Sequence, residues 1–513
     1  MRTEHSIKNI SIGILSQIVL VLLGFISRKV FIDSLGIEYL GINGLLTNVL
    51  SIMALVESGI GISIVYNLYK PLADGDRTKI IALVQAYKKA YGFLALIVII
   101  LSVCLFPFLG VLMKDGGNIE NLGLIYFLFV SKNVVSYLNA HKWSLINADQ
   151  RGYILAKVNL LFQVITMIAR IGILIVTDSF ILYLVIELAL HIIQTIYNGK
   201  IVNKRYPYIK TKEKYSLDIK TKENLIKNVK AMFLHNIGGF LVFGTDNLLI
   251  SSFISLATVG LYSNYIMITS QLSSLVTPIL GGIGASVGNL IATEDRDKNY
   301  SIFKVSFLVN FWLISLCVIF LYNLLEPFIS WWLGEEFILN RLSFIFILIN
   351  FYLTGMRTAI ATFKNKAGLF TQDKYAPVIE GLINLISSLI LVKFYGLAGI
   401  FMGTTLSTLL TIFWTQPKIV YKNVFKVSVR TYFKMYSLCL LLTVVGCFVT
   451  SLISDLLFVG GSFFVLIGKG IISIIVPSII YLSLFYKTKE FKYIHETINR
   501  VVPKIKNHLP FAG

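Results

Sequence analysis

Long apolar segments alternate with short polar segments along this chain of 513 residues. A run of about 20 apolar residues is the length at which an α-helix crosses the hydrocarbon core of a bilayer. The pattern predicts about fourteen membrane-spanning helices, at approximately residues 8–32, 42–66, 88–112, 121–146, 153–177, 179–200, 229–253, 259–291, 302–332, 341–364, 375–395, 397–421, 433–454 and 463–486. The longest polar stretch, residues 201–230, follows the sixth predicted span.

The second group of six predicted spans repeats landmarks of the first group. The matched landmarks are Gly41 with Gly260, Pro107-Phe108 with Pro327-Phe328, and Tyr153 with Tyr375. The separation along the chain is nearly the same in all three matches, which indicates an internal duplication. Because each half has six spans, both halves begin on the same side of the membrane. The repeat is therefore predicted to be parallel, about an axis along the membrane normal.

These patterns together predict an all-α integral membrane protein with two lobes of six helices around a central cavity. The expected segments are an N-lobe at residues 1–200, a basic cytoplasmic linker at 201–228, a C-lobe at 229–422, and two extra helices with a cytoplasmic C-terminal tail at 423–513. Parallel lobes of this kind rock against each other to open a cavity to alternate sides of the membrane. The architecture therefore favours a transporter.

Composition supports the membrane assignment, and the placement of charge predicts the orientation. The chain is 56% hydrophobic and 14% charged, with a mean hydropathy of +0.78, whereas soluble domains carry about 25% charged residues. Of the 46 Lys and Arg residues, 37 fall at predicted inner ends and loops and three at outer ones. The positive-inside rule therefore places both termini in the cytoplasm. The net charge of +20 reflects this asymmetry and contact with anionic lipid, not a nucleic-acid surface.

No metal site and no cofactor site is predicted. The four cysteines lie in apolar runs, the six histidines are scattered, and the sequence contains no P-loop. The predicted outer loops are no longer than roughly a dozen residues, which leaves little room for an external catalytic loop. The sequence therefore predicts a transporter and not an enzyme, and a transporter that ATP does not drive directly.

Basic residues at bilayer depth are the candidates for substrate binding. A charge there costs roughly 2.5–3.5 kcal/mol on insertion scales and normally faces the bundle interior or a water-filled cavity. Lys132 lies about eleven residues from either end of its predicted helix, roughly 15 Å from each membrane surface, and is too central to reach the headgroups. Arg28, Arg170 and Arg357 come from three other predicted spans. We expect these four bases to line a cationic central cavity; structural pairing with membrane acids is the alternative.

Two acids, Glu57 and Asp246, lie at membrane depth in opposite predicted lobes. A buried carboxylate can take up a proton near working pH, so both are candidates to bind a coupling ion, H⁺ or Na⁺. Structural pairing with the cavity bases is the competing interpretation for each acid. Glu187 and His191 lie one helical turn apart. They are interpreted as helix–helix hydrogen-bonding residues outside the site.

Several short motifs are similar to those of the bacterial polysaccharide-precursor flippases. They are ISIGILSQ at residues 10–17, LGxxxxG at 35–41, the VESGIG turn at 56–61 and TDN at 245–247. Together with the arrangement of six, six and two spans, they resemble the Wzx-type exporters of lipid-linked O-antigen, capsule or teichoic-acid repeat units. Those flippases belong to the superfamily that also includes the lipid II flippases and the multidrug and toxin extruders.

The resemblance implies a flippase of the bacterial cytoplasmic membrane. Its substrate would be an undecaprenyl-diphosphate-linked oligosaccharide, moved from the inner to the outer leaflet by alternating access with ion or membrane-potential coupling. By resemblance, Arg28, Lys132, Arg170 and Arg357 would hold the diphosphate and the sugar acids. The expected partners are this substrate, membrane lipids and the coupling ion. A monomer is expected, and association with a glycan polymerase or with glycosyltransferases is left open.

Two other functions compete with the flippase interpretation. A multidrug and toxin exporter of the same fold would carry cationic substrates and would favour a cavity dominated by acids, whereas the charges at bilayer depth here lean basic. A membrane glycan polymerase or glycosyltransferase would need an external catalytic loop, and the predicted outer loops are short.

Overall fold

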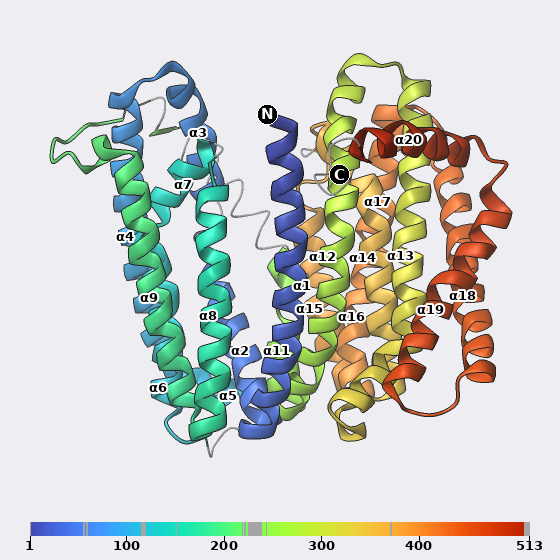
Figure 1. Cartoon of the computed structure of the whole chain (residues 1–513), viewed down its shortest axis with the longest axis horizontal. Coiled ribbons are helices and arrows are strands. Elements are labelled where there is room, and N and C mark those ends of the chain that lie inside the picture. Colours follow the sequence, from blue (N-terminus) through green and yellow to red (C-terminus); the bar gives the residue numbers. More distant parts are fainter. Residues whose placement is uncertain are drawn as a thin grey trace. The chain divides into compact units, whose positions relative to one another are not determined.

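The computed structural model is helical along its described part (Figure 1). The structure describes residues 2–54, 57, 60–113, 119–149, 151–217, 219, 222–223, 239–242, 244–369 and 372–506. Parts of the predicted linker, residues 218, 220–221 and 224–228, lie outside the described residues. The chain forms two compact units, residues 1–260 and 261–513.

The first unit consists of helices joined by short turns. Its elements are α1 (Arg2–Leu35), α2 (Ile37–Ala54), α3 (Ile60–Asp74), α4 (Arg77–Leu105), η1 (Phe106–Phe108), α5 (Leu109–Leu112), α6 (Leu122–Leu138), α7 (Ala140–Ala148), α8 (Tyr153–Thr177), α9 (Phe180–Arg205), η3 (Pro207–Lys210) and α11 (Asp246–Phe253). After η3 the chain returns to α4, where the Gln85 side chain bonds the backbone of Glu213 and Tyr215 at 2.6 and 3.1 Å.

The second unit is likewise helical. The long helix α12 (Leu256–Thr293) begins in the first unit and continues into the second. The further elements are α13 (Arg296–Trp332), η4 (Glu335–Phe337), α14 (Arg341–Lys366), α15 (Ala376–Tyr395), α16 (Leu397–Leu410), α17 (Ile412–Val420), η5 (Tyr421–Phe425), α18 (Arg430–Leu457), α19 (Phe463–Phe485) and α20 (Lys489–Lys506).

The prediction of an all-α protein with many membrane spans is confirmed. Within the described residues, nine helices are long and apolar enough to cross a membrane, and the bent pair α6 and α7 is a tenth if it forms one span. Each of the fourteen predicted spans contains helix among the described residues. No strand occurs among the described residues.

Several predicted spans depart from a regular α-helix, which the apolar runs do not reveal. The span predicted at 121–146 bends by 46° between α6 and α7. At this bend Asn139 leaves the helical conformation, and its side chain donates to the carbonyl oxygen of Thr195 in α9 at 3.1 Å. The span predicted at 88–112 runs on as one helix to Leu112 but tightens to a 3₁₀ turn at η1, where Pro107 has no N–H for the helical ladder.

Two helices that are related by the repeat begin with the same cap. Asp76 precedes α4 and Asp295 precedes α13, and each carboxylate accepts the backbone N–H three residues later, at 2.9 and 2.8 Å. Such a cap satisfies a helix donor that would otherwise have no partner. The two capping residues are separated along the chain by the same offset as Gly41 and Gly260.

The helix α13 lies at the centre of the second unit. The aromatic cluster around its first half is buried and comprises Phe303, Phe307, Phe363, Tyr421, Phe425 and Tyr432. Farther along α13, Ser315 hydrogen-bonds Tyr481 of α19 and accepts from Thr443 of α18 at 2.9 Å. The two helices beyond the repeat, α18 and α19, therefore pack against α13.

The landmark glycines Gly41 and Gly260 let two backbone segments pass at close range. A Cβ at Gly41 would lie less than 3.0 Å from the carbonyl oxygen of Leu256, and a Cβ at Gly260 would lie equally close to that of Ile37. Ile37 and Leu256 are the first residues of α2 and α12, and they keep the same offset as the two glycines. The contact is reciprocal, as at an interface between two-fold-related copies. It supports the parallel repeat that the sequence predicts.

We expect Gly41→Ala and Gly260→Ala to destabilise the protein by about 1–3 kcal/mol each, because the added methyl group must displace backbone. The matched control is Gly92→Ala in α4, where a Cβ would meet no atom within 4 Å. This change should stabilise the helix by about 0.4–1 kcal/mol. Thermal unfolding of the purified protein in detergent measures all three. Equal midpoints for the Gly41 and Gly92 variants would contradict the close crossing.

Candidate functional site

Three helices of the first unit bring charged side chains together around Glu187. Its Oε1 atom lies 2.5 Å from Nζ of Lys132 and 3.4 Å from a terminal nitrogen of Arg170. Glu187 belongs to α9, Lys132 to α6 and Arg170 to α8. The Glu187 side chain is only 14% exposed. One carboxylate thus forms ion pairs with two cations. Hydrogen bonds between charged groups of this kind are stronger than those between neutral groups.

An aromatic ring and a second arginine also contact Arg170. Its guanidinium lies 4.0 Å from the centre of the Tyr183 ring, a cation–π contact from the same helix as Glu187. Arg28 in α1 is close enough for the two guanidinium groups to repel each other. Arg28, Lys132, Arg170 and Glu187 are called the charge cluster below. It carries three positive charges and one negative charge.

Hydrogen bonds beside the charge cluster join α6 to α9 on successive turns. The Ser136 hydroxyl lies 3.0 Å from Nε2 of His191, and one turn farther Asn139 donates to the carbonyl oxygen of Thr195. Each such bond between membrane helices contributes roughly 0.6–2 kcal/mol. The bonds hold the two helices in one register, which positions Lys132 against Glu187.

The fourth predicted base, Arg357, lies in the second unit and has its own acid. A terminal nitrogen of Arg357 in α14 is 3.7 Å from Oε1 of Glu380 in α15. Thr408 of α16 donates its hydroxyl to the same oxygen at 3.1 Å. Glu380 is 5% exposed. The structure thus places Arg357 in a pair of one base and one acid.

The two predicted coupling acids occupy breaks between helices. Glu57 lies in the turn between α2 and α3 and forms a hydrogen bond with Tyr137 of α6. Asp246 is the first residue of α11 and is 8% exposed. A carboxylate in the first turn of a helix interacts favourably with the exposed N–H groups there. Both acids therefore have local structural stabilisation.

Charged residues near predicted outer ends of helices form pairs away from the charge cluster. Arg341 contacts Glu326 at 2.9 Å, and Lys469 contacts Asp455 at 2.8 Å. These pairs are partly exposed, and exposed ion pairs contribute little to stability. They supply useful controls for substitutions inside the charge cluster.

The sequence analysis brought Arg28, Lys132 and Arg170 into the candidate site but left Glu187 out. A signal for Glu187 exists in the helix depths. Lys132 lies ten residues from the start of α6, Glu187 seven from the start of α9, and Arg170 seven from the end of α8. These three helix ends are all predicted to lie at the outer membrane surface. At about 1.5 Å per residue, the three side chains therefore lie at a similar depth of roughly 10–15 Å from that surface.

Comparisons with known proteins assign this chain to a protein family. Residues 6–283, more than half of the chain, match the family described as "Polysaccharide biosynthesis protein". A protein of Salmonella typhi named "Putative O-antigen transporter" is 24% identical over 429 residues, which cover 79% of this chain and 93% of that protein.

Solved structures show the same fold. The lipid II flippase MurJ in an inward closed conformation matches with a TM-score of 0.64 and 16% identity, covering 92% of this chain and 98% of that one. An inward-facing multidrug resistance transporter of the MATE family and the MOP superfamily matches with a TM-score of 0.59 and 13% identity, covering 78% and 94%. These neighbours are transporters and flippases. The chain therefore belongs to the polysaccharide biosynthesis protein family, as a multi-pass membrane protein with the fold of the MOP superfamily.

Proposed function

We propose that this protein is a flippase that moves an undecaprenyl-diphosphate-linked oligosaccharide from the inner to the outer leaflet of the bacterial cytoplasmic membrane. The observation that carries the proposal is the excess of positive charge in the charge cluster. Lys132 and Arg170 contact one acid, Glu187, and Arg28 adds a further positive charge next to Arg170. A partly buried cluster of this composition attracts an anion, and the diphosphate is the anionic part of such a substrate.

The chemistry of the substrate requires such a cluster. A diphosphate cannot leave water for about 30 Å of hydrocarbon without compensation for its lost hydration. Arginine and lysine offer charge-assisted hydrogen bonds, and arginine binds phosphate oxygens in pairs. The Lys132 side chain is 42% exposed, so it is not enclosed within the first unit. The prenyl tail can remain in lipid while the head group binds.

Export of cationic drugs is the second candidate, because a MATE transporter shares the fold. A cationic substrate would be repelled by the charge cluster, so the flippase is favoured. Deletion of the gene separates the two functions: loss of surface glycan with unchanged dye resistance supports the flippase, and the reverse result supports drug export.

The remaining parts of the proposal concern orientation, coupling and partners. The distribution of Lys and Arg supports cytoplasmic N- and C-termini. Glu57 and Asp246 are proposed to bind the coupling ion, H⁺ or Na⁺. Arg357 is proposed to bind the substrate as well, by exchanging its contact with Glu380 for one with an anionic sugar. We propose a monomer that receives its substrate from glycosyltransferases and delivers it to a glycan polymerase.

We expect Lys132→Met to lower delivery of glycan to the cell surface by about ten- to a hundredfold, since a charge-assisted hydrogen bond contributes about 1.5–3 kcal/mol. The thermal stability of this variant should stay close to that of the wild type, because Arg170 still neutralises Glu187. Surface glycan in complemented cells and the unfolding midpoint of the purified variant are the two measurements.

The double variant Lys132→Met with Arg170→Met should unfold more easily, by about 3–5 kcal/mol, because Glu187 then loses both cationic partners. Lys469→Met is the matched control, because it removes a lysine from a partly exposed pair. It should leave both transport and stability unchanged. If Lys132→Met destabilised the protein as much as the double variant, the charge cluster would be structural and not a binding site.

A labelling experiment tests the orientation. In a variant without the four native cysteines, a cysteine at Glu335 should react with a membrane-impermeant reagent added to intact cells. A cysteine at Lys212 should react only after the membrane is opened. Both positions are exposed, so access to the reagent depends on the side of the membrane. Labelling of position 212 in intact cells would contradict the proposed orientation.

The amide variants Glu57→Gln and Asp246→Asn test coupling. We expect both proteins to fold and to transport with a pH dependence at least several-fold weaker than that of the wild type, because an amide cannot take up the coupling proton. Glu326→Gln is the control, since Glu326 pairs with Arg341 near a helix end. Wild-type transport by both amide variants at every pH would remove these acids from the coupling mechanism.

A further inference from the structure

A second basic site lies at one end of the first unit, away from the charge cluster. It is a cavity of about 580 Å³ between three segments of the chain. The turn from α3 to α4 contributes Arg77, the loop between α7 and α8 contributes Asp149 and Arg151, and the end of α9 contributes Lys204 and Arg205. We call it the basic pocket. Apolar helix gives way to polar chain here, at the end that the sequence predicts to be cytoplasmic.

The single acid of the basic pocket is already satisfied. Asp149 accepts from Arg151 at 3.1 Å and from the Tyr206 hydroxyl at 2.5 Å. Arg77 instead lies over the Tyr208 ring, 5.6 Å from its centre. Burial and the nearby Asp149 raise the pKa of both tyrosine hydroxyls, which keeps them protonated.

Three bases of the basic pocket remain without a carboxylate. Arg77, Lys204 and Arg205 form no ion pair with any acid in the part of the chain that the structure describes. All three are exposed at the surface of the unit. Cations that converge on one cavity and have no carboxylate partner there are arranged to receive an anion.

The repeat supplies a comparison within the same chain. The second unit has a pocket of about 770 Å³, and six residues of its lining follow lining residues of the basic pocket at the offset of the crossing glycines. The pairs that decide the charge are Arg77 with Arg296, Lys204 with Asn423, and Arg205 with Val424. The fold therefore forms this pocket in both units. Among the six matched lining positions, only the arginine that follows the helix cap, Arg77 and Arg296, is the same residue in both.

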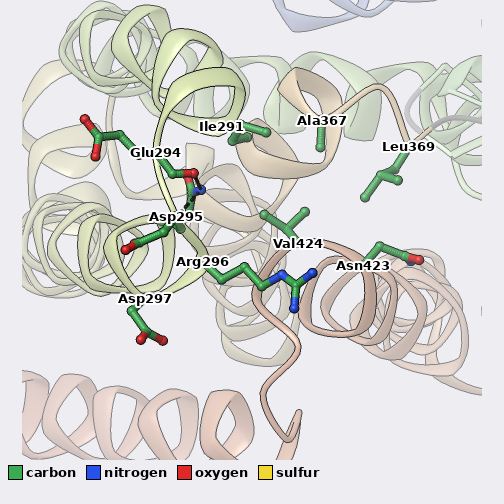
Figure 2. A pocket seen from close by; sticks show the side chains of 10 residues that line it. Ile291, Glu294, Asp295, Arg296, Asp297, Ala367, Leu369, Asn423 and Val424 are labelled. Atoms are coloured by element: carbon green, nitrogen blue, oxygen red, sulfur yellow. Dashed lines mark hydrogen bonds between the residues drawn. The ribbon is translucent and has the colours of Figure 1, made fainter.

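The pocket of the second unit has the opposite charge. Figure 2 shows the carboxylates of Glu294, Asp295 and Asp297 on one side of the pocket and the Arg296 guanidinium extending toward Asn423. Glu294 stands where the basic pocket has Gly75. The positive charge of the basic pocket is thus a property of its side chains and not a requirement of the fold.

We propose that the basic pocket binds a phosphate group, carried either by the headgroup of an anionic lipid or by a soluble phosphate compound. Two arginines can grip phosphate oxygens in pairs, and Lys204 adds a point charge. A cavity of about 580 Å³ is large enough for a phosphate and the group next to it. The position at the end of an apolar helix puts a lipid phosphate within reach. The site is independent of which glycan the protein moves.

Binding to the full-length protein tests the proposal with two probes. Inorganic phosphate, titrated against chloride at equal ionic strength, should raise the unfolding midpoint of the detergent-purified protein if the ligand is soluble. Native mass spectrometry after extraction from mixed bilayers should show retained phosphatidylglycerol over phosphatidylcholine if the ligand is a headgroup.

The pocket variant gives the basic pocket the residues of its counterpart, Lys204→Asn with Arg205→Val. It should weaken binding of the retained probe by about thirtyfold, since each basic residue near an anionic surface contributes about 1 kcal/mol. The matched control, Lys366→Asn with Lys422→Val, removes two exposed lysines from the second unit and should bind as the wild type does. Arg77→Gln is a second pocket variant and should weaken binding in the same way.

The outcomes separate the two ligand sources and the failure of the idea. If the pocket variants lose the stabilisation by phosphate and the control variant keeps it, the ligand is a soluble phosphate compound. If the pocket variants lose the retained phosphatidylglycerol and the control variant keeps it, the ligand is a lipid headgroup. Equal losses in pocket and control variants would show diffuse attraction and overturn the site. Unchanged binding in both pocket variants, or no preference for either probe in the wild type, would overturn it as well. Glycan transport is not read, so the result does not depend on the proposed function.

Discussion

The sharing of one carboxylate between two cations governs the interior of the first unit. An isolated cation at bilayer depth is unfavourable, and so is a carboxylate whose cationic partners have been removed. Glu187 reduces the cost for both Lys132 and Arg170 without cancelling their charge. A pair of one acid and one base would be stable but would have no net charge to attract an anion. Because the bases outnumber the acid, the helix bundle is stabilised and still attracts anions.

The two halves of the chain share helix caps and closely packed glycines, but they differ in their charged side chains. The caps at Asp76 and Asp295 keep one offset, and so do the crossing glycines. In the second unit, by contrast, Arg357 faces one acid, Glu380, which also accepts a hydrogen bond from the Thr408 hydroxyl. Duplication thus conserved what the helices need in order to form and pack. The charges, which decide what each half attracts, differ between the halves.

Much of the fold could be predicted from the sequence, because an apolar run of sufficient length specifies a membrane helix by itself. The bend at Asn139 could not, since it depends on a carbonyl group of α9 that is 56 residues away. The depth of Lys132 in the membrane could be predicted from its position within the apolar segment. Its partner, Glu187, could not, because the sequence pattern gives the position of a residue along its own helix but not which helix packs against it.

The same limit explains the candidate acids. Glu57 and Asp246 attracted attention because they interrupt apolar sequence, yet the acid that contacts two of the predicted bases is Glu187. Glu187 and His191 were interpreted as residues that hydrogen-bond between helices, and in the structure both side chains contact residues of α6. What the sequence did not reveal is that the partner of Glu187 is Lys132, one of the predicted bases. Identifying a partner on another helix requires the tertiary contacts.

The reciprocal contact of the crossing glycines restricts how the two halves can diverge. Gly41 lies against the backbone that starts α12, and Gly260 lies against the backbone that starts α2. A side chain gained at either position must be accommodated by a shift in the opposite half, where the matching glycine sits under the same restriction. The duplicated segments therefore cannot drift as independent copies at this point. Two positions far apart in the sequence are thus bound by one physical constraint.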